Sequence, residues 1–124
     1  MNIEGRIEFR ITGQDPERVT GEMPVQQGIL NPFGIVHAGA MLWFADVCAT
    51  VLAAGTAEFT PGAVGFPLGV NMNASLVGNQ QDGVLTASSV FVKRGRRLSI
   101  VRTTITGTGA RLIAEVTTSH IPAQ

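Results

Sequence analysis

Asp46 is the one charged side chain in a run of small and apolar residues that extends from Asn31 to Ala54. No proline interrupts this run after Pro32, and Ala, Leu, Met and Trp dominate it, so it predicts an α-helix over about residues 38–54. We expect a helix that is apolar on every side to be buried on every side. A carboxylate in the middle of such a helix is costly to bury unless another group pairs with it or a reaction uses it. Asp46 is therefore the first candidate for a catalytic residue.

The start of the same helix offers a second chemical feature. The backbone N–H groups of Ala38, Gly39 and Ala40 have no partner within the helix, and the helix dipole adds a positive potential there. Such a helix start suits an oxyanion or a polarised carbonyl oxygen. His37 stands at the cap position, where it either takes part in this site or only caps the helix.

The spacing of these two features argues for a second subunit. Asp46 lies eight residues beyond Ala38, or about 12 Å along the helix at about 1.5 Å per residue. One small reacting group cannot touch both ends, but two antiparallel helices about a twofold axis would bring Asp46 of one near the start of the other. Thr50 follows Asp46 by one turn, where its hydroxyl either helps to hold a water or bonds back to its own helix.

The helix face that carries Asp46 also carries Gly39, Leu42 and Trp43. Small residues such as Gly39 permit the close approach of a second helix, and Leu42 with Trp43 would form the wall of an apolar pocket. Packing into the core is the other interpretation for Trp43.

Four of the nine basic residues fall within positions 93–97, and we expect them at the tip of a hairpin. They are Lys93, Arg94, Arg96 and Arg97. Such a cluster in a neutral protein is either a solvated turn or a surface that suits a polyphosphate.

The rest of the chain alternates between strand-like runs and turns. Residues 5–12 alternate apolar with charged or polar side chains, residues 13–16 read as a turn, and residues 19–25 alternate again. Residues 26–37 form a loop, and a connection follows the helix at about 59–67. Four further runs rich in Val, Ile and Thr cover 67–77, 83–93, 97–107 and 110–121. We therefore expect one domain over residues 1–124, of the α+β class, with a curled antiparallel sheet of about six strands around one long helix.

Composition narrows the class of protein. The net charge is zero, which gives no electrostatic reason for a nucleic acid or an anionic membrane as partner. The helix is too short for a comfortable membrane span and carries Asp46 near its middle. The single cysteine, Cys48, excludes a disulfide within the chain and reads as a small core residue, which suits a cytoplasmic location. The charged N-terminus does not fit a signal peptide. The low content of charged residues points to an oligomer.

The residues named above match a known pattern. Asn31, Gly34, His37 and Asp46 fall at the spacings of Asn/Gln-x-x-Gly-x-x-His-Gly-Gly, followed by an acid nine residues after the His. The chain thus resembles the hotdog-fold acyl-CoA thioesterases of the phenylacetate-degradation (PaaI-like) branch, and also 4-hydroxybenzoyl-CoA thioesterases. The resemblance extends over nearly the whole chain, including Asn71 and Asn73 in one strand and the turn at Gly95.

The resemblance implies hydrolysis of an acyl-CoA thioester to a free acid and coenzyme A, in a site shared by two subunits. Asp46 of one subunit would act as general base or nucleophile. The N–H of Ala38, assisted by Asn31, would polarise the carbonyl from the other subunit. Gly69 and Asn71 would border the substrate, and the basic turn would meet the phosphates of coenzyme A. We expect a dimer of dimers (a homotetramer), no metal, and no cofactor, because coenzyme A is part of the substrate.

Two positions depart from the family pattern. Ala38 replaces the first glycine after the histidine, so its methyl group approaches the carbonyl. Some relatives carry a serine near the position of Gly69 to orient the water, and Thr50 is our candidate for that task here.

Two other functions stay open at this point. A hotdog module that binds acyl-CoA or a small ligand without turnover is the alternative that Ala38 and Gly69 favour. A hydratase or dehydratase would need a second acid–base residue beside Asp46, for which the chain offers only His37 and His120. An aromatic or medium-chain acyl group is expected from the apolar residues that would line the pocket: Trp43, Phe44, Phe66 and Met72.

Overall fold

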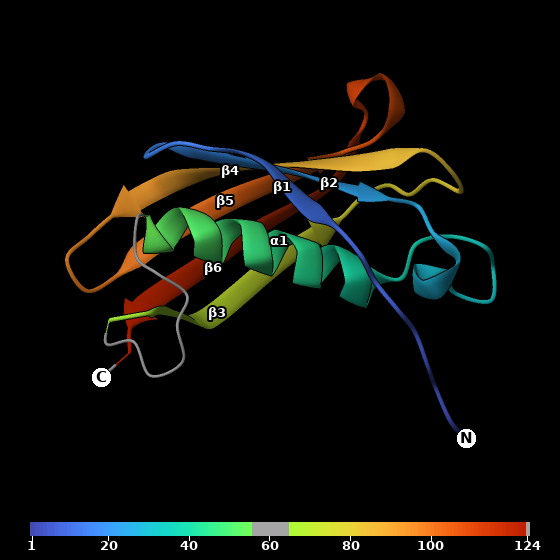
Figure 1. Ribbon diagram of the computed structural model, residues 1–124, viewed down its shortest axis with the longest axis horizontal. Helices are drawn as coiled ribbons and strands as arrows, with labels where there is room; N and C mark the ends of the chain where they lie inside the picture. The colour runs from blue at the N-terminus through green and yellow to red at the C-terminus, as the bar shows by residue number, and fades with distance from the viewer. Residues whose placement is uncertain (56–64, 124) are drawn as a thin grey trace.

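The computed structural model describes residues 1–55 and 65–123. Most of the connection expected at 59–67 lies outside these residues. One α-helix and six strands form the structure (Figure 1), with two short 3-10 helices, η1 and η2, between them. In chain order they are β1 (Arg10–Gln14), β2 (Arg18–Pro24), η1 (Gln27–Ile29), α1 (Ala38–Ala54), β3 (Pro67–Leu76), β4 (Val84–Arg94), β5 (Ser99–Thr106), η2 (Thr108–Ala110) and β6 (Leu112–Pro122).

The predicted central helix is confirmed as α1, which begins at Ala38 and ends at Ala54. It stops at Gly55, whose φ of 60° breaks the helical path and whose N–H donates to the carbonyls of Val51 and Leu52. Within the described residues, no helix has the length and apolar character needed to span a membrane.

The expectation that α1 is buried on every side is wrong for a single chain. The sheet covers only one side of the helix, which buries Ala40, Met41, Phe44, Ala45, Cys48, Ala49 and Leu52. Asp46 and Thr50 are half-buried, and Trp43 is 53 % exposed. The helix thus keeps an uncovered face, although its composition is apolar all round.

The sheet is fully antiparallel and has the strand order β1-β2-β4-β5-β6-β3. It curls around α1, as Figure 1 shows. Strands β4, β5 and β6 are neighbours both in the sequence and in the sheet. In contrast, β2 pairs with β4, and β3 pairs with β6, although the strands of these two pairs are not consecutive in the sequence. The inward side chains of the sheet and the covered side of α1 form one core.

Strand β3 forms one edge of the sheet and leaves apolar side chains uncovered. Alternate residues of a strand point to opposite faces. Met72 and Leu76 are paired with the buried Thr118 and Ala114, so they belong to the helix side of the sheet. They are nevertheless 39 % and 46 % exposed, so α1 leaves this part of β3 uncovered. The single chain therefore presents an apolar strip next to the open face of the helix.

The position of the first strand differs from the expectation. Strand β1 runs from Arg10 to Gln14, so the expected turn at 13–16 is shifted toward residues 15–17. The side chain of Asp15 accepts the N–H groups of Glu17 and Arg18 and sets the turn there. Residues before Arg10 instead run beside the segment that follows β2, where Arg6 N–H donates to the Gly28 carbonyl. Alternation alone did not separate this irregular stretch from a strand.

Candidate active site

Asp46 lines an open depression of about 360 Å³ between the middle of α1 and the start of β3. Thr50 lines the same depression, so the predicted pair on one helix face is confirmed as neighbours in one cavity. The remaining lining residues are Val47, Val51, Phe66, Pro67, Leu68 and Gly69. Most of these side chains are apolar, so the carboxylate and the hydroxyl are the polar groups that a bound molecule would meet.

Gly69 of β3 lies directly against the carboxylate of Asp46. A Cβ atom built on Gly69 would be 3.5 Å from Asp46 Oδ1. Asp46 and Gly69 also line a shallower depression with Val70, Asn71 and Met72. Gly69 and Asn71, both expected at the substrate site, thus lie in the neighbourhood of Asp46, and the missing side chain of Gly69 leaves a space there.

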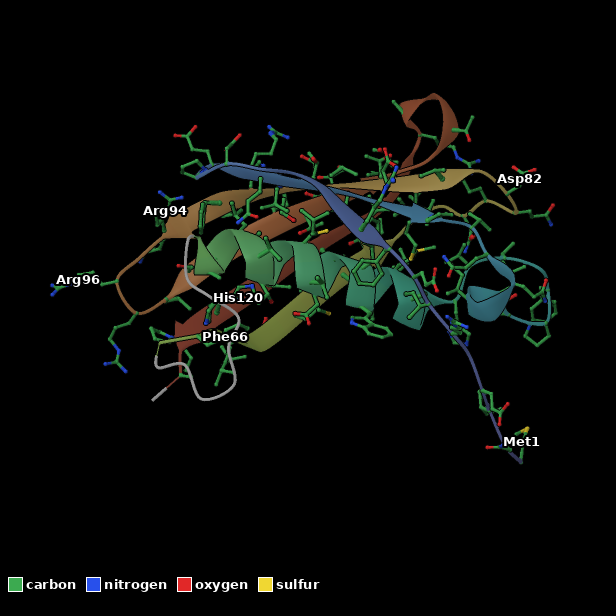
Figure 2. All side chains as sticks on the ribbon, viewed as in Figure 1. Met1, Phe66, Asp82, Arg94, Arg96 and His120 are labelled. Carbon is green, nitrogen blue, oxygen red and sulfur yellow. The ribbon has the colours of Figure 1, made fainter. Side chains whose placement is uncertain are left out.

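The sequence did not predict that His120 would lie beside Asp46 and Gly69. It lies on β6 directly opposite Gly69, and it is 1 % exposed. Its Nε2 atom is 2.8 Å from Thr118 Oγ1, while Nδ1 has no hydrogen-bond partner within the part of the chain that the structure describes. A Cβ atom on Gly69 would be 4.0 Å from both His120 Nδ1 and Cε1. In the view of Figure 2, the label of His120 lies below α1.

The surroundings of His120 set its charge. Burial lowers the pKa of the imidazole below the ordinary value of 6.5, and the nearby carboxylate of Asp46 opposes this by favouring the charged form. Since burial has the larger effect, the side chain is neutral at pH 7. In the sequence, His37 is the histidine near Asp46 and His120 lies far away in the last strand, and a search for polar residues on the strand paired with Gly69 would have brought His120 to this site.

The start of α1 has two free donors rather than three. The carbonyl of His37 accepts the N–H groups of Ala40 and Met41, so Ala40 is engaged, contrary to expectation. The N–H groups of Ala38 and Gly39 form no hydrogen bond in the described part of the chain, and both residues are exposed. His37 occupies the N-cap, as predicted, but its exposed side chain makes no capping hydrogen bond.

Asn31 shapes the loop that leads into the helix. Its Oδ1 atom accepts the N–H groups of Phe33 (2.9 Å) and Ile35 (3.3 Å). The loop turns at Gly34, whose φ of 77° is the left-handed conformation that glycine adopts without strain. The Nδ2 group of Asn31 has no partner among the described residues, so it is free to donate.

Trp43 does not share a cavity with Asp46. With His37, Gly39 and Ala40 it lines a separate depression of about 290 Å³ at the start of α1, completed by residues 3–7 and 28–30. Its ring packs edge-on against Phe9 at 5.9 Å between centroids. Leu42 is half-buried against the core. Trp43 thus lies at the start of the helix, and the expected wall of Leu42 and Trp43 along an apolar pocket stays a prediction.

The basic turn lies at the end of the molecule where α1 ends, as the labels of Arg94 and Arg96 in Figure 2 show. All four basic side chains are exposed. Arg94 lies 4.3 Å over the ring of Phe91 and donates to the carbonyl of Pro16, so it supports the local structure. Lys93, Arg96 and Arg97 have no ion pair or hydrogen bond among the described residues. These three remain available for an anionic ligand.

A metal centre has no support in the described residues, which contain no cluster of three or more His, Cys, Asp or Glu side chains. The site therefore consists of a carboxylate, a threonine hydroxyl and a buried neutral histidine on one part of the fold, and of free backbone donors on another.

No family model matches the sequence, but comparison with known proteins finds similar chains. The chain is 24 % identical over 113 residues to the 1,4-dihydroxy-2-naphthoyl-CoA hydrolase of Listeria monocytogenes serotype 1/2a (strain 10403S). The aligned residues cover 91 % of this chain and 89 % of that protein. A thioesterase enzyme from Staphylococcus aureus subsp. aureus Mu50 superposes with a TM-score of 0.87 at 25 % identity, covering 95 % of each chain.

A thioesterase-like protein from Streptococcus pneumoniae TIGR4, solved with coenzyme A, superposes with a TM-score of 0.82 at 17 % identity, over 94 % of this chain and 86 % of that one. These similarities confirm the predicted hotdog fold and the predicted resemblance to thioesterases. The more specific assignment to the PaaI-like branch stays a prediction.

Proposed function

We infer from these similarities that the chain is a hotdog-fold acyl-CoA thioesterase, which adds water to a thioester and releases a free acid and coenzyme A. The Listeria relative is named as the hydrolase of a CoA thioester, and the Streptococcus pneumoniae protein was solved with coenzyme A. The hotdog fold by itself would not assign an activity, since one fold hosts many functions. The residues of the site therefore have to carry the reaction.

The observation that carries the proposal is the carboxylate of Asp46. It projects from the middle of an apolar helix into an open depression and forms no hydrogen bond or ion pair in the described residues. Such a carboxylate is free to accept a proton from water or to attack a carbonyl carbon itself. We propose that Asp46 is the general base or nucleophile of the reaction, with Thr50 beside it as a hydrogen-bonding group.

The relatives add independent support for Asn31 and Asp46. The Staphylococcus aureus protein was solved as two variants, in which a glutamine and, further along its chain, a glutamate are replaced by alanine. The interval between those two positions equals the interval between Asn31 and Asp46. An amide and a carboxylate at this spacing suit the two tasks of polarising the carbonyl and activating the water.

We propose that the complete site requires two subunits. The free N–H groups of Ala38 and Gly39 lie about 10–12 Å along the helix from Asp46, so these N–H groups and the carboxylate of the same chain are too far apart to act on one carbonyl. The uncovered face of α1 and the apolar strip along β3 support a second copy packed against this side. In that arrangement the helix start of one subunit, with His37 and Asn31, would polarise the carbonyl that Asp46 of the other subunit hydrolyses. We also propose that the protein assembles as a homotetramer and is located in the cytoplasm.

The substrate is an acyl-CoA with an aromatic or medium-chain acyl group. The apolar lining around Asp46 suits such a group, since Val47, Val51 and Phe66 face the depression. The free cations of Lys93, Arg96 and Arg97 suit the phosphates of coenzyme A. No separate cofactor is needed, because the thioester itself is the activated group.

Thiol release from a panel of acyl-CoA thioesters tests this function, with benzoyl-, 4-hydroxybenzoyl-, phenylacetyl-, hexanoyl- and lauroyl-CoA as substrates. Asp46→Asn preserves shape but removes the base, so kcat should fall by about 100- to 10,000-fold. Asp82→Asn is the matched control, because Asp82 is exposed in the loop before β4. Size-exclusion chromatography and circular dichroism check that each variant folds and assembles.

Three outcomes would contradict the proposal in different ways. Full activity of Asp46→Asn would exclude the carboxylate as catalytic group. Binding of acyl-CoA by the wild type without thiol release would favour a binding module. Loss of enoyl-CoA absorbance without thiol release would favour a hydratase, for which His120 beside Asp46 supplies the second acid–base group that the sequence did not reveal.

A further inference from the structure

His120 has a buried nitrogen atom that no group of the described residues satisfies. The side chain is 1 % exposed, and its Nδ1 atom has no hydrogen-bond partner in residues 1–55 and 65–123. Buried polar atoms in native proteins nearly always have a partner, which is another protein group or an ordered water. An orphaned imidazole nitrogen beside the candidate active site therefore points to a molecule that binds there.

Gly69 leaves a position beside this nitrogen without a side chain. The point where a Gly69 Cβ atom would lie is 4.0 Å from His120 Nδ1 and 3.5 Å from Asp46 Oδ1. Any other residue at position 69 would place a carbon atom at this point. Glycine places none beside the imidazole and the carboxylate, which are the two groups that a bound water would contact.

The other side of the imidazole is already engaged. Nε2 lies 2.8 Å from Thr118 Oγ1, and a hydroxyl can either donate to it or accept from it. A neutral imidazole has one donor and one acceptor nitrogen, so Thr118 leaves Nδ1 free in either tautomer. Burial lowers the pKa of His120, so it stays neutral at pH 7 and does not neutralise the Asp46 carboxylate.

We propose that His120 is a positioning residue that holds the hydrolytic water over Gly69 through a hydrogen bond to Nδ1, while Asp46 takes the proton of that water. This role rests on the proposed function. The water oxygen forms a bond to the thioester carbon, Asp46 receives the water proton, the carbon–sulfur bond breaks, and the departing sulfur of coenzyme A receives that proton. His120 keeps its protonation state throughout. It takes the task for which Thr50 is the other candidate.

Two amide substitutions distinguish the role of Nδ1 from that of Nε2 in His120. In His120→Asn the amide lies near the position of Nδ1, and in His120→Gln it lies near the position of Nε2. We expect His120→Asn to keep kcat within about threefold of the wild type. His120→Gln and His120→Phe should lower kcat about 10- to 100-fold with little change in KM, because a misplaced water loses the reacting geometry.

Two controls address a purely structural role for His120. Thr118→Val removes the partner of Nε2 and leaves Nδ1 in place, so it should affect kcat less than His120→Gln does. Thr117→Ala changes the neighbouring residue on the opposite face of β6 and should behave like the wild type. Higher activity of His120→Gln than of His120→Asn, or wild-type kcat in His120→Phe, would overturn the proposal.

A crystal structure of the unliganded wild type gives a readout that does not depend on turnover. We expect an ordered water within about 3.2 Å of both His120 Nδ1 and a carboxylate oxygen of Asp46. The absence of any ordered atom there would overturn the proposal even in an active enzyme. A wild type that releases no thiol from any acyl-CoA would defeat the proposed function and, with it, the role of His120 in hydrolysis. The two failures are thus distinguishable.

Discussion

A Gly69→Ala substitution is expected to leave the fold intact and to remove most of the thioesterase activity. The added methyl group would lie 3.5 Å from Asp46 Oδ1 and 4.0 Å from His120 Nδ1, which are ordinary van der Waals distances. Gly69 is not among the glycines with positive φ, so alanine fits its backbone. Because alanine restricts the unfolded chain more than glycine, we expect the free energy of unfolding to rise by about 0.4–1 kcal/mol.

The effect on activity has the opposite sign. The methyl group would occupy the space between the imidazole and the carboxylate, where the hydrolytic water is proposed to bind. Displacing a reacting group by about 1 Å costs about 100-fold in rate, or about 2.7 kcal/mol in the activation free energy. We therefore expect kcat to fall about 100-fold, while KM changes little because the rest of the depression is untouched.

Urea unfolding at a fixed protein concentration and thiol release from the preferred acyl-CoA measure the two effects. Gly21→Ala is the contrasting variant, because its Cβ atom would lie 2.9 Å from Cys48 Sγ and 3.0 Å from Phe44 Cε1. That crowding should destabilise the protein by about 1–3 kcal/mol. A stable Gly69→Ala enzyme with wild-type kcat would refute the placement of the water, and a strongly destabilised one would refute the assignment of free space at Gly69.

Three other predictions concern the core, the open edge and pH. Cys48 is fully buried, which raises its thiol pKa to about 12, so a thiol reagent at pH 8 should modify it only after denaturation. Leu76→Lys places a charge on the apolar strip of β3, so size-exclusion chromatography should detect dissociation to smaller species, together with loss of thiol release. The unfolded chain binds a proton on His120 near pH 6.5, and the folded chain binds it only at lower pH. The contribution of His120 to stability should therefore be constant above about pH 7 and fall below pH 6.5 by at most about 1.4 kcal/mol per pH unit. His120→Phe should lack that part of the pH dependence in urea unfolding, and an unchanged pH profile would contradict the assignment.

Local patterns were sufficient for most of the secondary structure. The uncharged run after Pro32 and the glycine at position 55 predicted α1 to the residue, because helix propensity and the C-terminal glycine act within a few positions. The strands from β2 to β6 agreed with the predictions to within about two residues, since turn residues separate runs of Val, Ile and Thr. The prediction of the first strand was wrong, because the alternating residues before Arg10 lie beside the irregular segment that follows β2.

The candidate site was predicted only in part. Asp46 and Thr50 lie one helical turn apart, so their association followed from the sequence. The free donors of Ala38 and Gly39 followed from their place at the start of the helix. The structure places Trp43 in a depression with His37 and Gly39 at the helix start, and its expected place in the wall of an acyl pocket stays a prediction.

By itself, the sequence determined the helix, the succession of strands and the carboxylate at the centre, because propensity, alternation and helical spacing depend on neighbours along the chain. Only the tertiary structure decided that β3 pairs with β6, which brings His120 opposite Gly69 and beside Asp46. Strand pairing over such distances in sequence depends on the closure of the whole sheet around the helix. No local pattern carries that information, so the buried histidine beside the candidate catalytic carboxylate became visible only in the folded chain.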